Sequence, residues 1–167
     1  KVSTIAYDIS VTFDEPHSID ELTTAFSTIE NVDKVEFWGG ANVSRINKDN
    51  TYSNSFRLVA PPNNTKLISS PPLLKGRWLN AEDTNSIVIN QRLLYDEPDI
   101  KVGDTIKLLV NGKSQDWIIV GISKEILGFP TAYCNEDYFS QSLDMENFAM
   151  NAIVVTKDHN PNLQTEV

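Results

Sequence analysis

The chain of 167 residues has few of the residue types that carry covalent cross-links or acid–base chemistry. Cys134 is its one cysteine, so an internal disulfide bond is excluded. His17 and His159 are its only histidines and lie far apart in the sequence, which leaves little for a metal site or a general base. Both stand beside loop-forming residues, and we interpret them as surface histidines.

Basic residues are scarce relative to acidic ones. The chain has 14 lysines and arginines against 23 aspartates and glutamates, which gives a formal net charge of −9. A chain this acidic repels phosphate backbones and anionic lipid head groups. The balance therefore argues against nucleic acid as a partner and against docking on an anionic lipid surface.

Long apolar runs and catalytic motifs are missing as well. No run approaches the roughly 18 apolar residues of a membrane helix, and no signal peptide begins the chain. The sequence contains no G-x-S-x-G element and no glycine-rich phosphate loop, and its acidic clusters lack the spacing of a calcium loop. Cys134 has no partner pattern nearby and is predicted to be a core thiol at a strand end. We therefore predict a protein that is not an enzyme, with no cofactor and no metal site.

A hairpin is the clearest local structure that the sequence does contain. Residues 105–110 alternate, with Ile106, Leu108 and Val110 on one face, which is typical of a half-buried strand. Asn111-Gly112 follows, two residues that tolerate positive φ, and residues 115–122 return as a strand rich in β-branched side chains. Gly103 is predicted to form the turn that leads into this hairpin.

The first 60 residues predict a strand, a helix and two more strands. The first strand alternates over residues 7–13, and a capping box formed by Ser18 and Glu21 predicts a helix of about residues 18–30. A second strand begins at Val35 and continues through Ile46. Phe56, Leu58 and Ala60 mark the third strand.

The end of the chain adds a helix and a strand. Asn135 is a candidate N-cap for a helix over residues 136–143, and residues 151–156 read as a buried strand. Asn160-Pro161 resembles the start of a further helix. Both ends of the chain look cut from something larger, which suits a domain between two membrane helices, with Lys1 and Val167 emerging on the same side.

These elements predict an α+β fold class. A strand-helix-strand start and a helix-strand finish suit a split ferredoxin-like, or porter-like, α/β layer. This layer would comprise residues 1–60 plus 134–167, and residues 61–133 would form an inserted small β-rich subdomain. The proline pairs at 61–62 and 71–72 mark the candidate boundary.

Residues 73–139 carry a series of motifs in a fixed order. They are Gly76-Arg77-Trp78-Leu79, Asp83, Ile87-Val88-Ile89-Asn90, Val102-Gly103-Asp104-Thr105-Ile106 and the segment 117–122. In order and spacing this series resembles the extracytoplasmic domain of MacB/FtsX-type ABC transporter permeases, where "GR-x-L … D … IVIN … VGD-x-I-x-L … VGI" recurs. The segment "VDKVEFW" at residues 32–38 also resembles the family, and the likeness covers nearly the whole chain.

The resemblance implies a non-enzymatic domain at the extracytoplasmic side of the cell membrane. It would relay ATP-driven motion of the membrane helices to substrate or partner proteins outside. The implied partners are the membrane helices of the same permease, the ATPase subunit indirectly, and an adaptor or substrate protein. No nucleotide-binding domain is present in this chain, so transport activity is not expected from it alone.

An apolar loop is the candidate partner interface. Ile126, Leu127 and Phe129 lie in the loop of residues 125–130, whose glycine and proline prevent a regular strand. These side chains must either pack into the core or await a partner, because exposed apolar clusters are uncommon without a role. If the loop is exposed, we expect it to contact a partner protein or a neighbouring subunit together with Leu73 and Leu74.

Two other classes of protein remain open at this point. A secreted or surface binding module for carbohydrate or peptide would be favoured if Trp38, Trp78 and Trp117 line a groove. A hydrolase is the third hypothesis, and turnover of a generic ester or peptide panel would favour it.

Overall fold

A computed structural model describes residues 7–65, 67–68, 72–124 and 129–157 of the chain. The described part is rich in strands and has three short helices. In chain order the elements are β1 (Ile9–Ser18), α1 (Ile19–Ser27), β2 (Val32–Ile46), β3 (Phe56–Ala60), β4 (Leu73–Gly76), β5 (Ser86–Asn90), α2 (Gln91–Asp96), β6 (Thr105–Val110), β7 (Lys113–Ser123), β8 (Thr131–Cys134), α3 (Glu136–Ser142) and β9 (Phe148–Thr156).

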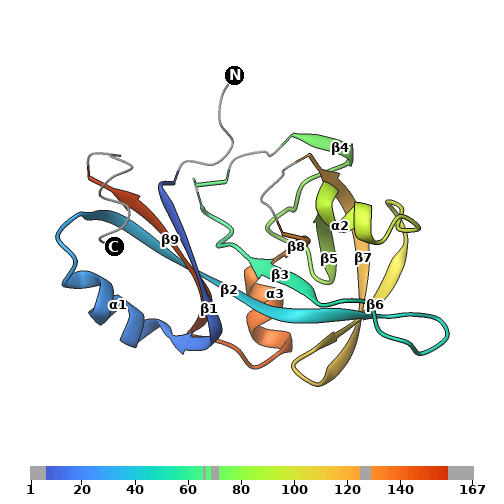
Figure 1. Ribbon diagram of the computed structural model, residues 1–167, viewed down its shortest axis with the longest axis horizontal. Helices are drawn as coiled ribbons and strands as arrows, with labels where there is room; N and C mark the ends of the chain where they lie inside the picture. The colour runs from blue at the N-terminus through green and yellow to red at the C-terminus, as the bar shows by residue number, and fades with distance from the viewer. Residues whose placement is uncertain (1–6, 66, 69–71, 125–128, 158–167) are drawn as a thin grey trace.

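Six of the strands close into a small barrel. The pairings run β2–β3–β8–β5–β7–β6, and β6 pairs back onto β2 to complete the ring. Side chains that point inward form one core cluster, with Leu58, Leu108 and Trp117 fully buried. β4 adds to the outside edge of β7. The barrel is seen on the right of Figure 1.

A three-stranded extension leaves the barrel along its longest strand. β9 lies between β1 and the first half of β2, and both neighbours are antiparallel to it. The first and last described strands therefore share a sheet. The expected positions of Lys1 and Val167 and the helix start at Asn160-Pro161 lie outside the described residues.

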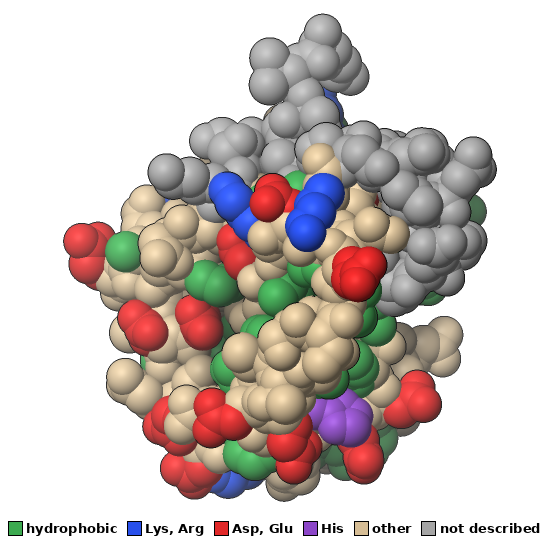
Figure 2. All heavy atoms as spheres, turned by 90° about the vertical axis from the view of Figure 1, so that its left-hand side faces the viewer, with side chains coloured by type: hydrophobic (Ala, Val, Ile, Leu, Met, Phe, Trp, Pro, Cys, Tyr) green, Lys and Arg blue, Asp and Glu red, His purple; other side chains and the backbone are tan. Residues whose placement is uncertain are grey.

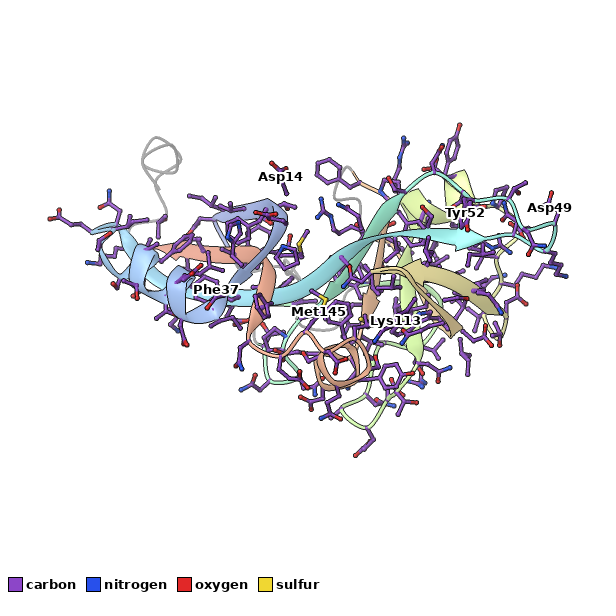
Figure 3. All side chains as sticks on the ribbon, turned by 90° about the horizontal axis from the view of Figure 1, so that it is seen from below. Asp14, Phe37, Asp49, Tyr52, Lys113 and Met145 are labelled. Atoms are coloured by element: carbon purple, nitrogen blue, oxygen red, sulfur yellow. The ribbon has the colours of Figure 1, made fainter. Side chains whose placement is uncertain are left out.

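β2 connects the two parts of the molecule. It runs without a break from Val32 to Ile46, first beside β9 and then beside β3 and β6. Figure 3 shows this strand crossing the molecule from the end that carries Phe37 to the turn at Asp49. The predicted continuation of the second strand through Ile46 is thus confirmed.

Helix α1 packs on one face of the extension. The Phe26 and Phe37 rings meet edge to face with centroids 5.7 Å apart. The predicted capping box is wrong, because the Ser18 side chain makes no capping hydrogen bond. Ser18 instead ends β1 and pairs with Phe148 of β9, so strand pairing replaces the local motif. The helix is correspondingly shorter than predicted.

The predicted hairpin is confirmed. Strands β6 and β7 pair along their length, and the turn residues Asn111 and Gly112 have φ values of 49° and 77°. Gly103, with φ of 94°, makes the predicted turn before it. The predicted helix cap is also present, since the Asn135 side chain accepts a hydrogen bond from the Tyr138 amide.

Residues of the motif series hold β4 against β7. Gly76 and Gly121 face each other across these strands. A Cβ on Gly76 would lie 2.2 Å from the Val120 carbonyl oxygen, and a Cβ on Gly121 would lie 2.1 Å from the Arg77 carbonyl oxygen. Arg77 follows Gly76 and binds both carboxylate oxygens of Asp83 at 2.9 Å. The Asp83 carboxylate also accepts a hydrogen bond from the Asn80 backbone amide. These motif residues therefore have a structural role in shaping the turn after β4.

The fold is a mixed sheet with few helices. The finer description as a split ferredoxin-like layer stays a prediction, as does the division at residues 60 and 134. The described sheet crosses that division, because β3 pairs with β8. Among the described helices, none is long and apolar enough to cross a membrane.

Candidate functional site

A groove of about 520 Å³ lies on the sheet face where the extension leaves the barrel. This size is within the range of small-molecule sites, roughly 300–1,000 Å³. Residues from β1, β9, β2, β3 and β8 line it. The opposite face of β2 carries α1 and α3, since Phe37 contacts Phe26 and a Cβ at Gly39 would contact Phe139. The groove therefore occupies a face that these helices leave uncovered.

Strand register explains the shape of the groove. Successive residues of a strand point to opposite faces, so Trp38, Gly40 and Asn42 of β2 all face the groove. Gly40 is the middle one and has no side chain. A Cβ there would lie 2.7 Å from the Leu58 carbonyl oxygen and 3.5 Å from Asn151 Nδ2. The backbone of β3 therefore leaves no room for a side chain at this position.

The groove has apolar walls. Trp38, Val59, Tyr133 and Ile153 belong to a second buried cluster on this outer face of the sheet. Phe129 stands at the rim and is 73% exposed.

Two nitrogen donors of the groove lack acceptors. Arg57 Nη1 and Asn151 Nδ2 are buried and have no hydrogen-bond partner in the part of the chain that the structure describes. Asn151 is 5% exposed, and its other amide atom, Oδ1, accepts a hydrogen bond from Thr12 at 3.0 Å. A buried donor without an acceptor costs about 1–3 kcal/mol. Both atoms therefore favour a ligand that supplies acceptors.

Arg57 differs from the chain's other three arginines. Arg45 and Arg77 form ion pairs with Asp99 and Asp83, which raise the pKa of each guanidinium. Arg92 lies over the exposed Tyr95 ring. For Arg57, in contrast, burial lowers the pKa, and attraction from Asp14 offsets this only in part.

The predicted interface residues fall at one end of the barrel. Leu73 of β4 pairs with Ser123 of β7, which also pairs with Asn90 of β5. The Asn90 side chain donates to the Phe129 carbonyl oxygen at 2.9 Å. Leu74 and Phe129 are exposed and Leu73 is partly buried. Ile126 and Leu127 lie outside the described residues.

The remaining candidate residues do not form a catalytic group. Cys134 is fully buried at the end of β8, as predicted, and burial raises the pKa of its thiol, which disfavours a nucleophilic thiolate. His17 lies in β1 rather than in a loop, and its ring meets Phe13 edge to face. His159 is outside the described residues. Within the described ranges no cluster of three potential metal ligands occurs.

The three tryptophans do not line one groove. Trp38 lines the groove, and Trp117 is enclosed in the barrel. Trp78 packs against the same cluster as Trp38, and its ring centroid lies 5.3 Å from that of Tyr133. Sequence reasoning missed the groove itself. The available signals were Gly39-Gly40 inside a long strand and single polar residues, Arg57 and Asn151, within apolar strands.

Comparison with known proteins identifies the fold. No protein-family model and no curated protein matches the sequence. The extracellular domain of the noncanonic ABC-type transporter YknZ from Gram-positive bacteria matches over 94% of this chain and 86% of its own, with a TM-score of 0.57 and 12% identity. The periplasmic region of MacB from Actinobacillus actinomycetemcomitans matches over 89% and 69%, with a TM-score of 0.56 and 13% identity.

The motifs and the fold lead to the same proteins. The motif series at residues 73–139 resembles this group by sequence, and the superposition covers nearly the whole chain. The sequence therefore has the fold of the extracytoplasmic domain of MacB-like ABC transporter permeases.

Proposed function

We propose that this chain is the extracytoplasmic domain of an ABC transporter permease, and that it relays ATP-driven motion of the membrane helices to substrate or partner proteins outside the membrane. The observation that carries the proposal is the shared fold with YknZ and MacB over most of the chain. The proposal places the domain at the cell membrane, with the permease's own helices as its first partners and the ATPase subunit acting through them.

The arrangement of the first and last strands supports this role. The β1 residue Ile9 pairs with Val154 near the end of β9. The Asp8 carboxylate accepts hydrogen bonds from the Thr156 amide and hydroxyl at 2.7 and 3.1 Å. A domain that receives motion from two membrane helices needs its entering and leaving strands fixed side by side in this way.

The continuity of β2 supports the transmission of motion. This strand forms part of both the extension and the barrel, so a displacement of the extension displaces the barrel as well. The barrel's own core is closed and well buried, which favours movement as a rigid body. The barrel surface that carries Leu73 and Leu74 is the candidate site of contact with an adaptor or a substrate protein.

The surface charge is consistent with a protein partner. Acidic side chains are spread over the end of the molecule that carries α1, as Figure 2 shows. This distribution disfavours nucleic acid and an anionic membrane surface as binding partners at that end.

A substitution at Leu74 tests the partner contact. Leu74 is 41% exposed on the edge strand β4, so Leu74→Ser should change the free energy of unfolding by less than about 0.5 kcal/mol. In the full-length transporter, the same substitution should impair rescue of the phenotype caused by deleting the transporter gene. The measurements are the melting temperature of the domain and growth of the complemented strain.

Tyr95→Ser is the matched control for this test. Tyr95 is 78% exposed on α2, away from β4 in sequence, and its replacement should leave both stability and complementation unchanged. Full complementation by Leu74→Ser would remove the interface from the proposal. A large loss of stability would instead assign Leu74 to the core.

A further inference from the structure

The groove beside β2 has the features of a ligand site that the transporter role does not require. Its apolar walls belong to a buried cluster. The half-buried Arg57 and the buried Asn151 each present one buried nitrogen, Nη1 and Nδ2, without an acceptor in the described structure. An apolar groove with a few unsatisfied donors is the usual composition of a small-molecule site.

The positions of the two donors define the ligand. Asn151 pairs with Trp38 of β2, and Arg57 pairs with Asn42 of the same strand. The Asn151 Nδ2 atom lies beside Gly40, 3.5 Å from the position of a Cβ there, and Gly40 is two residues from Asn42, which is about 7 Å along a strand. The ligand therefore needs two acceptor groups on neighbouring parts of its structure, attached to an apolar body.

The chemistry of each donor selects its acceptor. A guanidinium forms its strongest hydrogen bonds with a carboxylate, and the described residues give Arg57 no such bond. A neutral carboxamide N–H needs only a carbonyl oxygen as acceptor. Both hydrogens of Asn151 Nδ2 lack an acceptor in the described structure, while its Oδ1 accepts a hydrogen bond from Thr12. Asp14 is the acid that acts on Arg57 electrostatically, and a bound carboxylate would compete with it.

We propose that this groove binds a small apolar carboxylic acid that also carries a carbonyl group, such as an acylated amino acid or the carboxyl end of a short apolar peptide. The carboxylate is held by Arg57, the carbonyl oxygen by Asn151, and the apolar body lies between Trp38 and Val59. The site can be tested independently of the transporter role, because binding can be measured on the 167-residue chain itself.

Calorimetric titration with matched probes tests the site. N-decanoyl-phenylalanine and acetyl-Leu-Phe represent the acyl and the peptide source, and the carboxamide of each probe removes its charge. At least one acid should bind, and its carboxamide should bind at least about tenfold more weakly, since hydrogen bonds to charged groups contribute roughly 1.5–3 kcal/mol. Which of the two acids binds identifies the source of the ligand.

Variants of the chain assign the binding to the groove. Arg57→Gln should weaken binding of the acid at least about tenfold without lowering the melting temperature, because it removes a half-buried guanidinium that has no bonded carboxylate. Arg92→Gln is the control and should leave affinity unchanged, since Arg92 lies over Tyr95 on α2. The proposal is overturned if neither acid binds at millimolar concentration, or if acid and carboxamide bind equally. It is also overturned if Arg57→Gln binds the acid as wild type does.

Discussion

Replacing Gly121 with alanine should lower the free energy of unfolding by about 3 kcal/mol. An added Cβ would lie 2.1 Å from the Arg77 carbonyl oxygen and within 3.2 Å of two more backbone atoms of Arg77. These neighbours are backbone atoms of the turn that follows β4, so no side chain can rotate out of the way. Strand β4 must move away instead, and its pairing with β7 is lost. Chemical denaturation of the purified variant measures the change.

Gly112→Asn is the control for this prediction. Gly112 has φ of 77° in the hairpin turn, and an added Cβ would meet no atom within 4 Å. Asparagine tolerates that backbone conformation, so the variant should stay within about 0.5 kcal/mol of wild type. Equal stability of the Gly121 and Gly112 variants would contradict the close approach of β4 and β7.

The Asn90→Leu variant should be destabilised by about 3 kcal/mol or more. Asn90 is fully buried, and its Oδ1 accepts hydrogen bonds from the Leu93 and Thr131 amides at 2.9 and 3.1 Å. Its Nδ2 donates to the Phe129 carbonyl oxygen. Leucine has a similar volume but leaves all three backbone groups without this partner. Each buried group left unsatisfied costs about 1–3 kcal/mol.

Hydrogen exchange adds a local measurement to the stability of this variant. Asn90→Leu should increase the exchange rates of the Leu93 and Thr131 amides, relative to wild type, more than those of the amides in the β6–β7 hairpin. Asn85→Ala is the control, because the Asn85 side chain makes only exposed hydrogen bonds with described residues, one to the Asp116 carbonyl oxygen and one from the Thr84 hydroxyl, and its loss should cost less than about 1 kcal/mol. Wild-type exchange at Leu93 and Thr131 would rule out the hydrogen-bond role of Asn90.

The elements that the sequence predicted correctly depend on local chemistry. The β6–β7 hairpin follows from Asn111-Gly112 between two alternating strands, and the start of α3 follows from the Asn135 side chain. Ser18 shows the limit of such reasoning. Its capping motif is intact in the sequence, yet pairing with Phe148, 130 residues later, draws it into a strand.

Closure of the barrel could not be predicted in the same way. It requires parallel pairing of β3 with β8 and of β5 with β7, and the return of β6 to β2. None of these pairs is adjacent in the sequence, so no turn residue marks them. The groove depends on the same long-range pairing, because Arg57 and Asn151 share a face only when β2 lies between their strands.

Accessibility of an engineered cysteine on intact cells tests the central claim most directly. Lys48→Cys places a thiol in the exposed turn after β2, the turn in which Figure 3 labels Asp49. Cys134 contributes little background, because it is fully buried and burial raises the pKa of its thiol. If the domain is extracytoplasmic, a membrane-impermeant maleimide should label the full-length Lys48→Cys protein more strongly than wild type, and the labelling above wild type should be equal in intact and permeabilised cells. Labelling that appears only after permeabilisation would contradict the account.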